Sequence, residues 1–225
     1  MKKEIELFFK KLDDDLFMLD EFSELMEDEE ISSDFYKVII EKSIKTKLEF
    51  IDLLKSYDNK KIVDYIIRWL ENEKDVQIIA SLISLLGKYE FENKLNILKP
   101  FLKSEERRIR ANVIEAIGKN RLTEEISQIL IPFLKDPDNR VRANAAMVLW
   151  NNENLRDKVK QAFSTMIENN DKWMNASAIY AFGELGIEDF ILYLLEHLKD
   201  EDEDICRNAL IALIGFADKS TNKEK

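Results

Sequence analysis

Glycine, proline, cysteine and histidine are all scarce in this chain of 225 residues. It contains five Gly, three Pro, one Cys and one His. Few turn-forming residues, a hydrophobic content of 45% and no long strand-like alternation together predict a fold that is nearly all helix. The single cysteine, Cys206, cannot form an internal disulfide, which favours a cytoplasmic protein.

Long hydrophobic runs are also missing from the sequence. No segment approaches the ~18 consecutive apolar residues that a membrane span needs. The first six residues, Met1 to Glu6, are charged and lack the apolar core of a secretory signal. We therefore expect a cytoplasmic protein that does not enter a membrane.

The single histidine, His197, restricts the chemistry that the chain could perform. Metal sites with two histidines are excluded, and a Ser-His or Cys-His arrangement would have to use this residue. The simplest interpretation is an exposed histidine on a helix. The sequence also lacks a glycine-rich loop that could hold a phosphate. We therefore predict no enzymatic activity, no cofactor and no metal site.

The net charge of −11 is unevenly distributed along the chain. Residues 1–35 carry 13 acidic and 4 basic side chains, whereas residues 99–142 carry 10 basic and 7 acidic ones. Affinity for the phosphates of nucleic acid comes mainly from Lys and Arg, usually gathered on a basic face. The charge therefore argues against nucleic acid as the partner.

A helix-turn-helix unit between Ile126 and Asn151 provides the pattern for much of the chain. Apolar residues recur at helical offsets over residues 126–134, so they share one face of a first helix. Pro137 stops this helix, and Asp138 or Asn139 can cap the second helix with a side-chain oxygen. The second helix has its own apolar stripe, so the two helices together still expose apolar side chains that neighbouring helices must cover.

The second helix recurs at a nearly constant period. Its five copies begin 31, 32, 33 and 31 residues apart, at Ile78, Ile109, Val141, Met174 and Ile205. Counted from these residues, the first, fifth and ninth columns are apolar and the third is small in the first four copies. The fourth column is short and polar: Ser81, Asn112, Asn144, Ser177 and Asn208. The period is typical of a solenoid of helical hairpins, and we expect the three asparagines to bond backbone groups at the joints between repeats.

The turn and second helix KDPDNRVRANAAMVL (135–149) resemble the HEAT repeat family, particularly its short bacterial and archaeal form. EERRIRANVIEAIG (105–118) and DEDICRNALIALIG (202–215) repeat this motif. The resemblance implies an all-α fold, a right-handed α-α superhelix built as a solenoid of antiparallel helix pairs. The expected organisation is divergent N-terminal capping helices over 1–60, five HEAT-like repeats over 61–217, and a disordered tail over 218–225.

Two proline positions fit the resemblance and one tryptophan departs from it. Pro100 and Pro132 share a column of the first helix, where the family often has a kinking proline. Trp150 stands in the tenth column of the second helix, which holds glycine in three other repeats: Gly87, Gly118 and Gly183. The departure affects the expected local geometry and leaves the predicted architecture unchanged.

Five arginines cluster around the starts of two successive second helices: Arg107, Arg108, Arg110, Arg140 and Arg142. Acidic residues close in sequence favour a ladder of hydrogen-bonded ion pairs that ties one turn to the next, as the family often shows. The alternative is an anion-binding site, because helix N-termini would add to the attraction for a phosphate or an acidic peptide. Both interpretations remain open.

The seventh column points toward the concave face if the second helices line it, as the family implies. It changes from polar to apolar along the chain: Ser84, Glu115, Met147, Tyr180 and Ile211. These side chains either fill gaps in the packing or form a contact surface. We predict a partner-binding site that consists of Met147, Trp150, Tyr180, Glu184 and Ile211, and a protein partner with basic residues that match the acidic rim.

A non-enzymatic interaction scaffold is the leading functional hypothesis, because solenoids offer extended binding surfaces. Two alternatives rest on the resemblance. A HEAT-like DNA glycosylase that acts on alkylated bases is disfavoured by the net charge, and no motif supports a HEAT-like bilin lyase or lyase-type chaperone. The oligomeric state is not indicated by the sequence.

Overall fold

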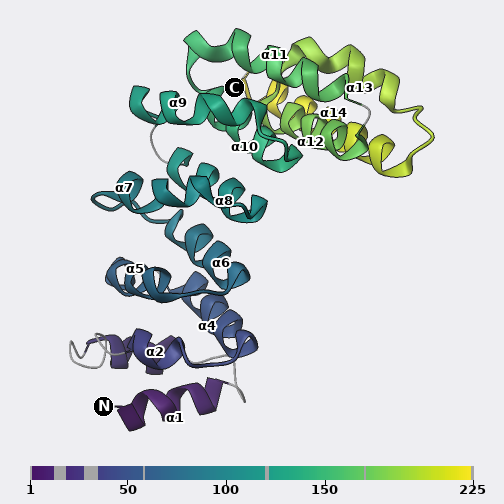
Figure 1. The fold of residues 1–225 in the computed structure, drawn as a ribbon. Helices are drawn as coiled ribbons and strands as arrows, with labels where there is room; N and C mark the ends of the chain where they lie inside the picture. The colour runs from purple at the N-terminus through teal and green to yellow at the C-terminus, as the bar shows by residue number, and fades with distance from the viewer. Residues whose placement is uncertain are drawn as a thin grey trace. The chain divides into compact units, whose positions relative to one another are not determined.

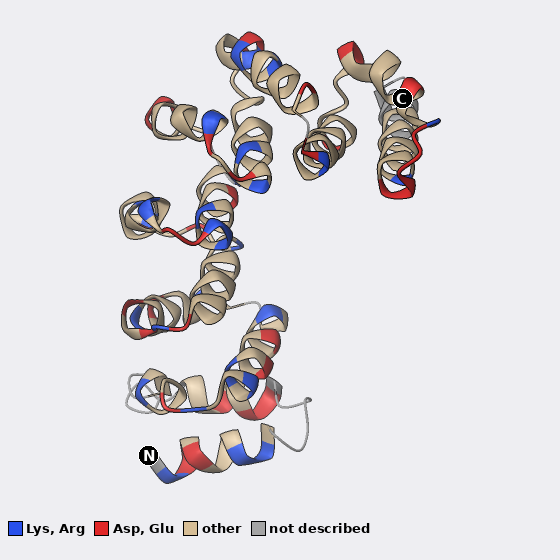
Figure 2. Ribbon diagram, turned by 45° about the vertical axis from the view of Figure 1, so that its right-hand side comes forward, with Lys and Arg blue, Asp and Glu red and all other residues tan. Residues whose placement is uncertain are grey.

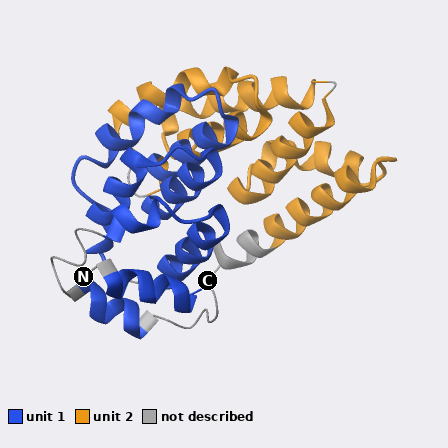
Figure 3. Cartoon of the chain, turned by 60° about the horizontal axis from the view of Figure 1, so that its bottom comes forward, with its two compact units in different colours: residues 1–117 blue, residues 118–225 orange. Residues whose placement is uncertain are grey.

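Short helices joined by tight turns make up all the secondary structure in the computed structural model (Figure 1). The structure describes residues 2–12, 19–27, 35–57, 59–119, 122–169 and 171–223, and these residues contain no strand. This confirms the predicted all-α class, built from helix pairs. The chain divides into two units, residues 1–117 and 118–225 (Figure 3). The boundary falls inside the predicted repeat array, next to the end of a second helix.

The helices of the two units are 3 to 14 residues long, apart from one helix of 21 residues at the C-terminal end. Unit 1 contains α1 (Lys2–Leu12), α2 (Leu19–Glu27), a helical stretch at 35–39, α4 (Ile44–Ser56), α5 (Ile62–Asn72), α6 (Val76–Leu86), α7 (Lys94–Leu98), the 3-10 helix η1 (Lys99–Lys103) and α8 (Arg107–Gly118), whose last residue begins unit 2. Unit 2 continues with α9 (Glu124–Leu130), η2 (Ile131–Lys135), α10 (Asn139–Leu149), η3 (Glu153–Leu155), α11 (Arg156–Ile167), α12 (Lys172–Leu185), η4 (Glu188–Phe190), α13 (Ile191–His197) and α14 (Glu203–Lys223). The helix α14 thus runs through most of the segment predicted as a tail, whose last two residues lie outside the described part.

Aromatic rings form the core of the N-terminal segment that the sequence predicts as a cap. The side chains of Phe8, Phe22, Phe35 and Phe50 are fully buried. Phe35 and Phe50 stack with their centroids 5.4 Å apart, and Phe50 reaches Trp69 of α5 at 6.0 Å. The cluster therefore joins the N-terminal helices to the repeats of unit 1.

One side-chain hydrogen bond closes the turn before every second helix. A polar side chain accepts from the backbone N–H two residues later, at 2.9–3.2 Å, in all five turns: Glu73, Ser104, Asp136, Asn169 and Asp200. In four turns the donating residue is an aspartate whose own side chain caps the helix: Asp75, Asp138, Asp171 and Asp202. The predicted cap is therefore Asp138, and the side chain of Asn139 bonds elsewhere.

The first helices of two repeats change their geometry at proline, as predicted. Pro100 lies near the start of η1, which directly follows α7, and Pro132 lies near the start of η2, which follows α9. Proline has no N–H to donate to the carbonyl four residues earlier, so an α-helix cannot continue regularly through it. The tighter 3-10 segment completes each first helix.

The tenth-column glycines let successive second helices pack closely. A Cβ atom built on Gly183 would lie 2.7 Å from the Cα atom of Ala212, which no side chain could tolerate. A Cβ on Gly118 would lie 2.3 Å from Val148, and a Cβ on Gly87 would lie 3.1 Å from Ala116. In each of these three pairs the tenth column of one helix meets the eighth column of the next.

The fourth-column asparagines lie at the joints between repeats. Asn112 is buried, and its Nδ2 atom donates to the carbonyl oxygen of Ala80 in the preceding second helix at 2.8 Å. This confirms the predicted role for Asn112. Asn144 is also buried, whereas Asn208 is half-buried in the last repeat.

Candidate protein-binding surface

The helices α10, α12 and α14 pack side by side in unit 2 and present one continuous row of side chains. Tyr180 of α12 and Ile211 of α14 are each 57% exposed, and Glu184 is exposed one turn beyond Tyr180. Met147 of α10 is half-buried. Gly183 of α12 lies against Ala212 of α14, which fixes the relative height of the two helices. Along the helix axes, Tyr180 and Ile211 are therefore within about one helical turn of each other. Four of the five predicted site residues therefore reach solvent along adjacent helices.

Trp150, the fifth predicted residue, has a structural neighbour. It is half-buried at the end of α10, and the guanidinium carbon of Arg156 lies 5.4 Å from the centroid of its ring. This cation–π contact holds the indole against α11. Only part of the Trp150 ring can therefore contact a partner.

Trp173 belongs to the same surface and was missed by the sequence analysis. It lies one residue before the first column, seven residues before Tyr180, so both project from one face of α12. Its side chain is 58% exposed, and the Nζ atom of Lys172 lies 5.0 Å from the centroid of its ring. The heptad spacing from Tyr180 was the signal that could have identified it. We call Met147, Trp173, Tyr180, Glu184 and Ile211 the second-helix surface.

The backbone beneath Trp173 is anchored from two sides. The Nδ2 atom of Asn139 donates to the carbonyl oxygen of Trp173 at 3.1 Å and to the Oγ atom of Ser177 at 2.6 Å. The backbone N–H of Trp173 donates to Asp171 at 2.8 Å. The indole is thus exposed on a rigid support, which lowers the entropy cost of using it in binding.

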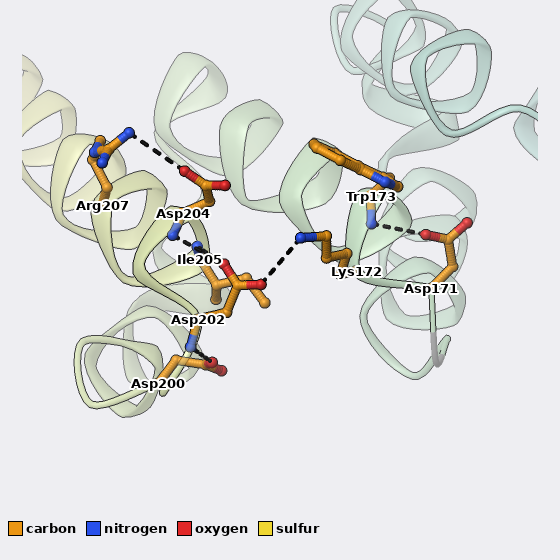
Figure 4. A network of polar contacts seen from close by, with 8 residues as sticks. All are labelled: Asp171, Lys172, Trp173, Asp200, Asp202, Asp204, Ile205 and Arg207. Atoms are coloured by element: carbon orange, nitrogen blue, oxygen red, sulfur yellow. Dashed lines mark hydrogen bonds and ion pairs between the residues drawn. The ribbon is translucent and has the colours of Figure 1, made fainter.

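Acidic residues follow one another along the turn before α14 and at the start of that helix (Figure 2). Asp202 accepts backbone hydrogen bonds from Asp204 at 3.0 Å and from Ile205 at 3.4 Å, and pairs with Lys172 at 3.3 Å (Figure 4). The hydrogen bond from Asp204 and the pairing with Lys172 lower the pKa of Asp202. Part of the predicted acidic rim therefore serves to cap and position the helix.

Two of the five clustered arginines close their own turns. Arg110 donates through Nη1 to the carbonyl oxygens of Ser104 at 2.9 Å and Glu105 at 2.8 Å, and Arg142 donates through Nε to the carbonyl of Asp136. Cys206 occupies the same column, and its Sγ atom lies 3.2 Å from the carbonyl oxygen of Leu198. In these three repeats the second-column side chain therefore ties the second helix to the turn before it or to the end of the first helix.

The remaining arginines, Arg107, Arg108 and Arg140, are exposed at the starts of α8 and α10. The first two belong to unit 1 and the third to unit 2. An anion site that joins all five arginines stays a prediction.

The single histidine, His197, lies at the end of α13 beside Tyr193. His197 stacks on Tyr193 with ring centroids 4.1 Å apart, and its Nδ1 atom lies 2.9 Å from the carbonyl oxygen of that tyrosine. Among the described residues no group of three or more His, Cys, Asp or Glu side chains could hold a metal ion. Nor is any described helix both long and apolar enough to cross a bilayer.

Comparisons with known proteins agree with the repeat pattern. Two solved structures of engineered proteins are similar at low levels: a designed armadillo repeat protein (14% identity, TM-score 0.41, 80% of this chain and 98% of the other) and a second engineered protein (13% identity, TM-score 0.42, 84% and 90%). No curated protein matches the sequence significantly. The family model for HEAT repeats matches residues 127–215, which contain α10, α12 and the whole second-helix surface. Residues 127–215, fewer than half of the chain, are therefore similar to HEAT repeats.

Proposed function

We propose that this chain is a non-enzymatic scaffold that binds a protein partner through the second-helix surface. The supporting observation is that Trp173, Tyr180 and Ile211 each expose more than half of their area on adjacent helices. Aromatic side chains are enriched at the centres of protein interfaces and supply most of the binding energy there. A monomeric surface rarely exposes such a group of large apolar residues without a use for it.

The charge around this surface favours a partner with basic residues. Glu184, Glu201 and Glu203 are exposed near the apolar row, and the whole chain carries a net charge of −11. This field would accelerate the encounter with a basic protein and repel nucleic acid. A cytoplasmic location is part of the proposal, since Cys206 has no second cysteine with which to form a disulfide.

Affinity capture with matched variants tests this function. The double variant Trp173→Ala/Tyr180→Ala removes two exposed rings, while Leu192→Ala removes a 75% exposed side chain on α13, away from the row. Proteins that the wild type and Leu192→Ala retain, and the double variant loses, are the expected partners. Binding of a recovered partner should weaken at least about tenfold in the double variant, by calorimetry.

Two outcomes would contradict the proposal. The double variant could retain the same proteins as the wild type, which would remove the second-helix surface from binding. Alternatively, the protein could bind duplex DNA with a steep salt dependence, or release an alkylated base from it. In that case the arginines at 107–142 would become the candidate site.

A further inference from the structure

Lys172 holds its ammonium group between an aromatic ring and a carboxylate at the edge of the second-helix surface (Figure 4). Its Nζ atom lies 5.0 Å from the centroid of the Trp173 ring and 3.3 Å from an oxygen atom of Asp202. Both groups attract a cation, the ring through its π face and the carboxylate through its charge. We call Trp173 and Asp202 the cation site, because one positive group contacts both of them.

Hydrogen bonds to the backbone hold both members of the cation site. Asp202 accepts from two backbone N–H groups at the start of α14, at 3.0 and 3.4 Å. The backbone of Trp173 donates to Asp171 at 2.8 Å and accepts from Asn139 at 3.1 Å. The carboxylate of Asp202 and the backbone of Trp173 are therefore fixed. The side chain of Lys172, in contrast, is half exposed and is held by two contacts that are each weak at a protein surface.

A positive charge at position 172 is not needed to join two second helices or to start α12. Asn139 is the first residue of α10, as Lys172 is of α12, and it joins α10 to α12 through two hydrogen bonds of a neutral amide. A positive charge in the first turn of a helix opposes the helix dipole. The position of Lys172 is therefore better explained by the cation site that it occupies than by the stability of α12.

The turn that carries Asp202 has more negative than positive charge. Residues 200–204 are all acidic, and the basic side chains of the flanking sequence and the cation site are Lys199, Arg207 and Lys172. Five acidic groups against three basic ones leave a net charge of −2 even with Lys172 in place. The exposed Arg140 starts α10, so positive charge lies on the side of α12 that packs against α10. A second cation is therefore attracted to the α14 side, where the cation site lies.

We propose that Lys172 occupies the cation site in place of a lysine or arginine side chain of the protein partner, which displaces it on binding. This role of Lys172 rests on the proposed function and names the group that the partner presents at Trp173. In the exchange the ring and the carboxylate keep a cation, and the released ammonium group of Lys172 becomes hydrated. Because the internal cation competes with the partner, the apparent affinity falls in proportion to the fraction of molecules in which the site is free.

Binding of a dye-labelled hexalysine peptide, measured by fluorescence anisotropy at low ionic strength, tests the competition. Lys172→Met removes the internal cation, while Lys158→Met removes an exposed lysine of α11 and changes the net charge equally. Lys172→Met should bind hexalysine at least about threefold more tightly than Lys158→Met. Asp202→Asn keeps an oxygen atom that can cap α14. It should bind at least about threefold more weakly than Glu188→Gln, a matched loss of charge beyond the other end of α12.

The indole N–H signal of Trp173 in a proton–nitrogen correlation NMR spectrum locates the bound peptide. This signal is identified as the indole signal that is missing from the spectrum of Trp173→Phe. Hexalysine should shift it in the wild type, and should shift it at lower peptide concentration in Lys172→Met. Circular dichroism checks that each variant is folded, and Lys172→Gln replaces Lys172→Met if that variant is not.

Each of three results would overturn the role of Lys172. Equal affinities of Lys172→Met and Lys158→Met would show that Lys172 does not compete for the site. A hexalysine peptide that binds without shifting the Trp173 signal lies elsewhere on the acidic surface. No binding by the wild type or by Lys172→Met would exclude a cation site altogether. The proposed function is judged separately, because partner capture with Trp173→Ala/Tyr180→Ala does not depend on the result with Lys172→Met.

Discussion

A buried ion pair in unit 1 offers the sharpest test of how the repeats are held together. The Nζ atom of Lys47 in α4 lies 2.8 Å from the Oε2 atom of Glu73, in the turn between α5 and α6, and both side chains are buried. Glu73 also accepts from the indole N–H of Trp69 at 2.9 Å and from two backbone N–H groups. The carboxylate therefore links three helices and closes a turn.

Glu73→Gln keeps the size of the side chain and removes its charge. Lys47 would then be a buried cation without its counter-ion, which typically costs about 3–5 kcal/mol. The double variant Lys47→Met/Glu73→Gln removes both charges and should recover much of this loss. The difference between the single and double changes should be at least about 1.5 kcal/mol, because the residues act as a pair.

The pH dependence of stability provides an independent check. Burial opposes ionisation of Glu73, but the hydrogen bonds from Lys47, Asp75, Trp69 and Lys74 outweigh it, so the pKa is lowered. A depressed pKa contributes stability that is present above the unfolded value of about 4.3 and is lost as the pH falls through the folded value. The part of the free energy of unfolding that is lost when Glu73 becomes protonated should be absent in Glu73→Gln.

Urea unfolding followed by tryptophan fluorescence measures both effects. Trp69 alone reports on unit 1 when Trp150 and Trp173 are replaced by phenylalanine in every protein compared. The reasoning is refuted if Glu73→Gln costs less than about 1 kcal/mol, or if the single and double variants lose the same free energy of unfolding. An unchanged acid profile would count against the role of the carboxylate charge.

Three further changes test the joints and the core. Asn144→Ala should lower the free energy of unfolding by about 1–3 kcal/mol through an unsatisfied buried group; an unchanged urea curve with lost partner binding would reverse that assignment. Gly183→Val should destabilise unit 2 by at least about 1–3 kcal/mol in urea unfolding, because its Cβ would collide with Ala212, whereas Gly215→Ala meets only ordinary contacts and should be tolerated. Tyr65→Phe should cost little, because the Tyr65 hydroxyl is buried without a partner among the described residues. Burial raises the pKa of Tyr65, so the wild type loses stability as the pH rises above about 10, and Tyr65→Phe should resist alkaline unfolding, as circular dichroism would show.

Features that depend on local chemistry could be predicted from the sequence. The cap at Asp138 or Asn139 and the disturbed helices at Pro100 and Pro132 follow from residues within a few positions of each other, and the structure places the cap at Asp138. The hydrogen bond of Asn112 at the joint between repeats could also be predicted. A polar residue that recurs at the same position among buried apolar residues must find a hydrogen-bond partner there in each repeat. The regular spacing of the repeats made these features predictable along the whole array.

Features that depend on distant or missing neighbours could not be predicted. Lys47 and Glu73 pair across different helices, in a part of the chain where the repeat spacing is degenerate. The exposure of Leu210 and Ile214 follows from the absence of a described repeat after α14, and their residue types are those of a buried face. Trp150 could not be interpreted correctly either, because its position in the tenth column did not indicate that its ring would contact Arg156.

In four of the five turns before second helices, the residue that closes the turn and the aspartate that caps the helix are two positions apart, so the turn is held by residues within it. Unequal crossing-over that duplicated or deleted one whole period would therefore leave every remaining turn intact. The contacts between neighbouring second helices, among them those of the glycines and asparagines, would have to be matched again. Such a chain can change its length in evolution by whole repeats far more readily than by single residues, whose insertion would separate a cap from its helix.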